Sequence, residues 1–257
     1  MAKTVFSPVG LRGMNQTADL KPRKLPIMKK TVLIIIALLA SLSMSAQEET
    51  AISATVDVTY ASKYVFRGVQ LADETLMPSV EIGYGNFAAG AWSAQPITSN
   101  IDNEIDFYAG FSMPIDDTWG VDIGATIYYY PELDTAGGTV DDYTFEPYIG
   151  IGGEVNGIST GVTAYYDTTL ETLTLEGSLG YSVPLEGTGS SLDFGASYGH
   201  VDPNGGSGYN YYNLGISIPF AISDTATITV SIDYANSDLP GPDTDFIFGT
   251  IGMSIGF

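Results

Sequence analysis

The feature that most constrains this chain is a strict alternation of apolar and polar residues, which begins at residue 52 and continues, with short interruptions, to residue 257. The segment 52–60 reads Ile-Ser-Ala-Thr-Val-Asp-Val-Thr-Tyr, so that every second residue is apolar. Successive side chains of a β-strand point to opposite faces, and this pattern therefore predicts strands with one apolar and one polar face. The 3.6-residue period of an amphipathic helix does not occur in these segments.

Counting every alternating segment predicts an all-β fold of twelve strands. The predicted strands are 52–60, 80–84, 87–94, 105–113, 121–129, 143–151, 158–166, 173–183, 192–198, 212–220, 226–234 and 247–257. The second and third of these segments alternate less regularly, and they are joined by the turn dipeptide Gly85-Asn86. Ten or fourteen strands are the near alternatives.

The composition of the polar face separates two kinds of β protein. In a soluble sandwich this face carries Lys and Glu toward water. Here it carries Gly, Ser, Thr, Tyr and scattered acids, and Lys63 and Arg67 are the only basic residues beyond residue 46. Segments of about ten residues with apolar side chains toward lipid and small or polar side chains toward a lumen are typical of a transmembrane β-barrel. We therefore expect an antiparallel barrel in the bacterial outer membrane.

Aromatic residues at the ends of the apolar faces support the same interpretation, because such barrels carry aromatic girdles at both membrane interfaces. One predicted girdle consists of Tyr60, Tyr129, Tyr143, Tyr166, Tyr198, Tyr212 and Tyr234, and the other of Tyr84, Phe87, Tyr181, Phe220 and Phe257.

The connections alternate in length, as they do in outer-membrane barrels. The short set is 85–86, 114–118, 152–157, 184–190 and 221–224, and the longer or more acidic set is 61–77, 95–103, 131–141, 167–171, 201–208 and 236–244. An even number of strands predicts both termini on the periplasmic side. The last alternating segment ends on Phe257, which resembles the signal read by the barrel assembly machinery; a buried last strand is the alternative.

The N-terminal region has the pattern of a secretory signal peptide. Two lysines follow Met28, then a nine-residue apolar run at 32–40, then small residues up to Ala46. Nine residues are too few to span a membrane as a helix. We expect residues 1–46 to be removed, leaving a single barrel domain at 47–257. Translation is expected to start at Met28, with a genuine extension over 1–27 as the alternative.

The charge and the rare residue types exclude several functions. The chain has 30 acidic and nine basic residues, and a surface this acidic repels nucleic acid. It has no Cys and a single histidine, His200. Disulfides and thiolate metal sites are therefore impossible, a catalytic triad is disfavoured, and we expect no cofactor.

Three motifs carry a family resemblance. Tyr-Val-Phe-Arg-Gly at 64–68, Glu-Ile-Asp-Phe-Tyr-Ala-Gly at 104–110 and Asp-Ile-Gly-Ala-Thr-Ile-Tyr-Tyr-Tyr-Pro at 122–131 follow in this order. Together they resemble the TorF family of Gram-negative outer-membrane porins, and the resemblance beyond residue 131 is general barrel character only. It implies an outer-membrane β-barrel of porin type without a defined substrate.

The polar faces supply the candidate functional residues, which we predict to line a lumen. They are Lys63, Arg67, Glu81, Glu104, Asp106, Asp122, Glu146, Glu176, Asp193 and Asp233. Lys63 and Arg67 are included because each lies an even number of residues after Asp57, which would put it on the same inward face if the first strand continued that far. One interpretation is an acidic channel that concentrates cations, with Arg67 at a constriction. The other is a filled barrel in which Arg67 is a structural counter-charge among tyrosines.

Two further functions are weighed against a channel for small solutes or cations. An outer-membrane lipase would need a serine beside His200, whereas Asp202 follows it at two residues' distance. A closed structural or adhesive barrel would bind a partner through its outer loops, of which 132–142 and 238–245 are acidic. These loops lack the spacing of a calcium-binding EF-hand, and solvated charge is the simpler explanation.

Overall fold

The computed structural model describes residues 52–98, 101–131, 142–241 and 243–257. The predicted signal peptide at 1–46 and most of the acidic loop 132–142 lie outside these ranges.

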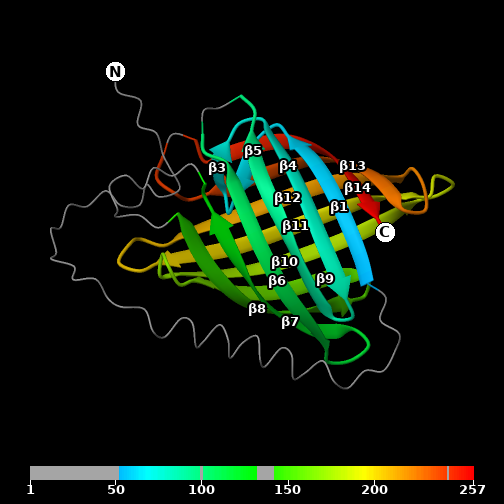
Figure 1. Cartoon of the computed structure of the whole chain (residues 1–257), viewed down its shortest axis with the longest axis horizontal. Helices are drawn as coiled ribbons and strands as arrows, with labels where there is room; N and C mark the ends of the chain where they lie inside the picture. Colours follow the sequence, from blue (N-terminus) through cyan, green and yellow to red (C-terminus); the bar gives the residue numbers. More distant parts are fainter. Residues whose placement is uncertain (1–51, 99–100, 132–141, 242) are drawn as a thin grey trace. The chain divides into compact units, whose positions relative to one another are not determined.

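Twelve strands close into a single barrel in which every neighbouring pair is antiparallel, as predicted (Figure 1). In chain order the wall consists of β1 (Ile52–Ala61), β4 (Thr75–Tyr84), β5 (Phe87–Pro96), β6 (Glu104–Pro114), β7 (Trp119–Tyr129), β8 (Tyr143–Val155), β9 (Ile158–Asp167), β10 (Thr172–Leu185), β11 (Ser190–Pro203), β12 (Tyr209–Ala221), β13 (Ala226–Ser237) and β14 (Asp245–Gly256). Each strand pairs with its neighbours in the chain, and β14 pairs with β1 to close the barrel.

Two short strands, β2 (Tyr64–Phe66) and β3 (Val69–Ala72), pair only with each other. They form a hairpin within the connection from β1 to β4. The sequence analysis gave 61–77 as a long connection and did not predict a hairpin within it. The hairpin was missed because strands of three and four residues are too short to show a period-two pattern.

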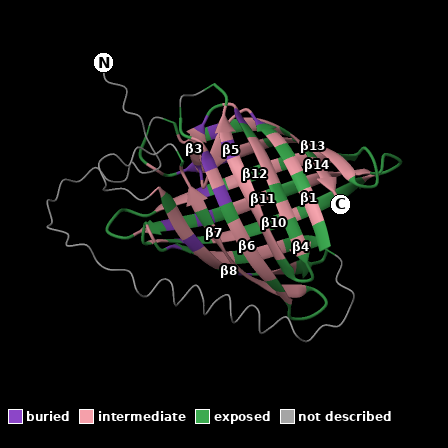
Figure 2. Ribbon diagram, viewed as in Figure 1, coloured by how far each residue is buried: buried purple, intermediate pink, exposed green. Residues whose placement is uncertain are grey.

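The alternation of the sequence appears on the wall as alternating exposure (Figure 2). Large apolar side chains at every second position face outward, for example Val80 and Ile82 on β4, which are 44% and 53% exposed. The positions between them face the interior. This outward surface is the one that a lipid bilayer would cover.

Small residues on the inner face leave room for tyrosine side chains from neighbouring strands. A Cβ placed on Gly124 would lie 2.6 Å from the Tyr148 ring, and one on Gly199 would overlap the Tyr211 ring. The high glycine content thus serves an interior lined with tyrosines, since any larger residue at these positions would displace a ring.

The two ends of the barrel differ. Tight turns of two to four residues join the strands at one end, such as Gly85-Asn86 between β4 and β5. The longer connections, including the one with the β2–β3 hairpin, lie at the other end. Of the twelve aromatic residues predicted to form girdles, all are exposed except Tyr129 and Tyr234, which are half-buried. Phe257 has a 76% exposed side chain, and its backbone bonds to Ala54 of β1.

No helix with the length and hydropathy needed to cross a membrane occurs among the described residues.

Candidate functional site

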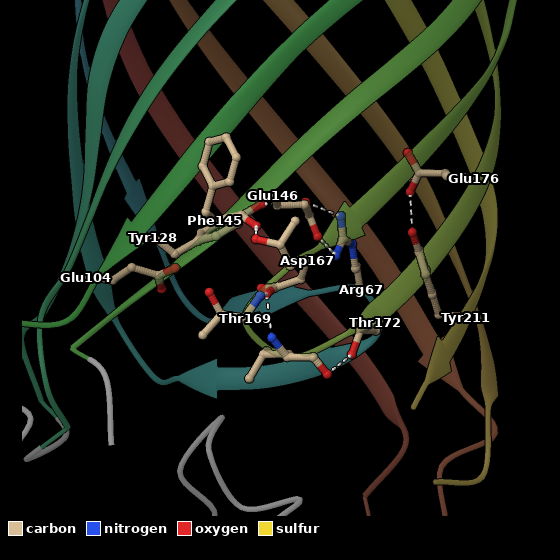
Figure 3. Close-up of polar contacts among 12 residues, drawn as sticks. Arg67, Glu104, Tyr128, Phe145, Glu146, Asp167, Thr169, Thr172, Glu176 and Tyr211 are labelled. Atoms are coloured by element: carbon tan, nitrogen blue, oxygen red, sulfur yellow. Dashed lines mark hydrogen bonds and ion pairs between the residues drawn. The ribbon is translucent and has the colours of Figure 1, made fainter. Parts of the chain in front are cut away.

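The β2–β3 hairpin folds into the barrel, and its tip is a two-residue turn formed by Arg67 and Gly68 (Figure 3). Both residues have positive φ, 48° and 73°, as the tight turn favoured between paired strands requires. A Cβ on Gly68 would lie 2.7 Å from Cβ of Tyr211 on β12 and 2.9 Å from Cβ of Ser237 on β13. The tip is therefore packed against the wall so closely that only glycine fits.

At the base of the hairpin, aromatic residues hold it to the opposite part of the wall. The Tyr64 hydroxyl donates to Glu104 on β6 at 3.2 Å, and the Tyr64 ring lies 5.5 Å from the ring of Trp92 on β5. The Phe66 ring lies 6.0 Å from that of Tyr128 on β7. The hairpin thus contacts both sides of the interior.

The tip carries an ion pair with the wall. Arg67 donates from Nη1 and Nη2 to the two carboxylate oxygens of Glu146 on β8, at 2.7 and 2.8 Å. The two side chains are only 13% and 4% exposed. The Tyr128 hydroxyl donates a further hydrogen bond to Glu146 at 2.9 Å. Burial alone would lower the pKa of Arg67, but its hydrogen bonds and charge interaction with Glu146 raise that pKa, and the guanidinium stays charged.

Two further carboxylates lie near this pair without a counter-charge. Glu104 and Asp106 on β6 are 6% and 8% exposed. Glu104 accepts hydrogen bonds from the hydroxyls of Tyr64 and Tyr130, whereas Oδ1 of Asp106 has no hydrogen-bond partner. Among the described residues, Arg67–Glu146 is the one ion pair between side chains. Of the carboxylates of Glu104, Asp106 and Glu146, Arg67 therefore neutralises one.

The remaining predicted residues are spread over the inner wall. Glu81 accepts from the Tyr108 hydroxyl at 3.1 Å, Glu176 from the Tyr211 hydroxyl at 2.7 Å, and Asp122 and Asp233 accept from Ser112 and Ser231. Oδ1 of Asp193 is buried without a hydrogen-bond partner. That these residues line a conducting pore stays a prediction.

The prediction that Lys63 and Arg67 lie on the inner face of the first strand is wrong in its reason, because β1 ends at Ala61 and neither residue belongs to it. Lys63 lies in the connection that leads into the hairpin, where it is half-buried. A hydrogen bond from Thr98 and, to a smaller extent, the charge of Lys63 lower the pKa of Glu74. Arg67 lies inside the barrel because the hairpin carries it there.

A cavity of about 300 Å³ remains beside the hairpin tip. Phe66 and Arg67 border it on the hairpin side, and the wall contributes Tyr165 of β9, Glu176 of β10 and Asp233 of β13. Residues of six different strands line this space together with the hairpin. The hairpin thus narrows the interior at this level without filling it.

A family model described as "Bacterial protein of unknown function (Gcw_chp)" matches residues 45–254. The chain belongs to the Gcw_chp family. The description of this family assigns no function. No curated protein matches the chain.

Solved structures share the barrel of this Gcw_chp protein. The KdgM porin aligns with a TM-score of 0.53 and 11% identity over 79% of this chain and 99% of that one. A complex titled "KdgM porin in complex with disordered oligogalacturonate" aligns with a TM-score of 0.54 and 9% identity over 80% and 99%. The NanC porin aligns with a TM-score of 0.55 and 14% identity over 79% and 98%. At these identities the similarity shows a shared fold.

The single histidine of this Gcw_chp protein lies outside the interior. Nδ1 of His200 lies 2.9 Å from Oδ1 of Asn210, and the Tyr198 hydroxyl donates to the same oxygen at 3.0 Å. Asn210 in turn donates to Asp238 at 2.7 Å. The imidazole of His200 therefore contacts the side-chain amide of Asn210, whereas a lipase would need a serine at this position.

The sequence interpretation missed the hairpin residues that shape the site, above all Phe66, Gly68 and the wall residue Tyr211. A signal was present, since Arg-Gly stands between Tyr-Val-Phe and Val-Gln-Leu, and a glycine in a two-residue connection favours a tight hairpin turn.

Proposed function

We propose that this protein is an outer-membrane channel through which small solutes diffuse passively, with a preference for cations. The observation that carries the proposal is the partial obstruction of the lumen: the β2–β3 hairpin narrows the barrel, and a cavity of about 300 Å³ remains beside its tip.

The charge of the interior supports cation preference. The inner wall carries the carboxylates of Glu81, Asp122, Glu176, Asp193 and Asp233 in addition to the buried group near the hairpin. The charge of Arg67 is paired with that of Glu146. Fixed negative charge in a narrow passage with low-dielectric walls raises the local concentration of cations.

The comparisons supply support at the level of the fold. Two of the proteins with this barrel are named porins, and the motifs at 64–68, 104–110 and 122–131 resemble the TorF family of porins. A polyanion such as the oligogalacturonate named for one of these structures does not suit an acidic lumen. We therefore propose that this chain, which shares the fold, favours positively charged solutes.

Delivery to the outer membrane is part of the proposal. Residues 28–46 would act as a removed signal peptide, and 47–257 would form the mature barrel. The exposed Phe257, at the end of the strand that closes the barrel against β1, would present the terminal signal to the barrel assembly machinery. The apolar outer face would then contact membrane lipid. We propose no lipase activity, because no serine is a hydrogen-bond partner of His200 among the described residues.

Planar-bilayer conductance tests the channel. The protein extracted from outer membranes should give stepwise currents in KCl. A variant in which a short Gly/Ser linker replaces residues 64–72 should keep the barrel and give larger steps, since it lacks the hairpin. A barrel that folds but gives no current in either form would leave a closed structural or adhesive role.

A further inference from the structure

The walls of the cavity beside the hairpin tip are largely aromatic. Phe66 of the hairpin, Tyr128 of β7, Tyr165 of β9 and Phe248 of β14 all border it. Aromatic rings attract cations through the negative potential of their faces, with an energy that increases as water is excluded.

This aromatic surface already holds one cation that belongs to the chain itself. The guanidinium carbon of Arg67 lies 4.7 Å from the ring centre of Phe66 and 4.8 Å from that of Tyr165. Both distances are within the range of a cation–π contact. Phe66 and Tyr165 thus already contact a cation, which shows that rings in this part of the barrel bind positive charge. Tyr128 and Phe248 are the two lining rings for which no such contact occurs among the described residues.

Two carboxylates complete the cavity, and each has a free oxygen. Glu176 accepts from Tyr211 on Oε2, and Asp233 accepts from Ser231 on Oδ2. No described residue donates a hydrogen bond to Oε1 of Glu176 or Oδ1 of Asp233. Arg67 also borders the cavity, but its charge is paired with Glu146 through both terminal nitrogens. Among the described residues, Glu176 and Asp233 therefore have no ion-pair partner.

The volume of the cavity and the residues that line it favour an organic cation over a metal ion, a sugar or an anion. A volume of about 300 Å³ exceeds what a bare metal ion fills, and such an ion would leave the rings without a contact. A sugar would use the rings and the carboxylate oxygens but, being neutral, would leave the charges of Glu176 and Asp233 uncompensated. An anion would meet two carboxylates. An organic cation satisfies both the rings and the acids.

We propose that this cavity is a binding site for a small organic cation with an ammonium or guanidinium head group, held between the aromatic rings at the hairpin tip and the carboxylates of Glu176 and Asp233. The inference rests on the proposed channel function and names its class of solute. If the channel passes through this cavity, binding there would favour entry of such solutes over inorganic ions of the same charge.

Choline and its neutral carbon isostere, 3,3-dimethylbutan-1-ol, form a matched pair of probes for titration calorimetry on the protein extracted from outer membranes. Choline should bind saturably, and the isostere, which has the same shape without the charge, should not bind. Glu176→Gln and Asp233→Asn should each weaken choline binding about tenfold or more, whereas Glu186→Gln, an exposed turn residue, should have no effect. Heat-modifiable migration in gels confirms that each variant is folded.

Absence of choline binding, equal binding of the isostere, or unchanged affinity in both carboxylate variants would overturn the proposal. If one variant fails to fold, the other variant and the probe pair on the unmodified protein still decide it. Potassium conductance measured on the same preparation separates the two proposals: current without choline binding refutes this site alone, and absence of current refutes the channel.

Discussion

Arg67 and Glu146, 79 positions apart in the sequence, form a two-pronged ion pair with N–O distances of 2.7 and 2.8 Å inside the barrel. The pair joins the tip of the β2–β3 hairpin to strand β8. Because both side chains are buried, removal of either one leaves an uncompensated charge in a region of low dielectric constant. The position of the hairpin therefore depends on this contact.

Replacement of one partner should destabilise the protein strongly. Glu146→Gln leaves Arg67 unpaired and is expected to cost about 3–5 kcal/mol in the free energy of unfolding. Arg67→Met, which strands Glu146, should cost a similar amount. Urea unfolding followed by tryptophan fluorescence measures both values. In the double variant the losses should be clearly less than additive, and additive losses would show that the two residues do not depend on each other.

Neutralising Asp106 should have the opposite effect. Its Oδ1 has no hydrogen-bond partner among the described residues, and Asp106 is buried like the nearby carboxylates of Glu104 and Glu146. Asp106→Asn keeps the shape and removes the charge, so that the free energy of unfolding should rise by about 1–3 kcal/mol. The same urea experiment applies. A loss of stability in Asp106→Asn would mean that this carboxylate has a stabilising partner that the geometry does not account for.

The tip glycine can be tested against a glycine of similar conformation. Gly68 and Gly157 have φ values of 73° and 80°, but a Cβ would meet three atoms within 2.9 Å at Gly68 and nothing within 4 Å at Gly157. Gly157→Ala should cost only the conformational penalty of about 1 kcal/mol. Gly68→Ala should cost more and displace the hairpin, which would enlarge the conductance steps. Equal effects of the two substitutions would contradict the close packing of the tip.

Two adjacent residues of β13 test which face meets lipid. Val230 is 42% exposed on the outer face, and Thr229 lies on the inward side of β13 together with Ser231 and Asp233. Val230→Arg should destabilise the barrel by about 2–4 kcal/mol in lipid vesicles, the range for a cation near the bilayer midplane. Thr229→Arg should cost much less, since its charge would face the lumen. Similar losses for both would contradict the assignment of faces.

The wall of this barrel was predictable because period two is a local property of each strand. Val121 and Ile123, for example, share a face whatever the rest of the chain does. The number of strands and their antiparallel order followed from counting such segments, since short connections leave few other ways of joining them.

The arrangement inside the barrel was not predictable in the same way. Arg67 meets Glu146 only because a short hairpin turns inward, and the direction of that turn depends on Gly68 packing against Tyr211 and Ser237. Contacts between such distant positions have no local signature. The alternation in their strand predicts that Glu104 and Asp106 face inward, but the hydrogen bonds of Glu104 with Tyr64 and Tyr130 depend on tertiary positions that no local pattern gives.

The most direct test of the central claim is the reversal potential of single channels in a KCl gradient, measured on the protein extracted from outer membranes. The acidic lumen predicts a potential whose sign shows that potassium carries more current than chloride. This preference should persist at about 0.15 M salt, where the Debye length is about 8 Å, because charges within a narrow passage are screened less than charges on an open surface. A chloride-selective current, or a folded barrel that carries no current, would contradict the account.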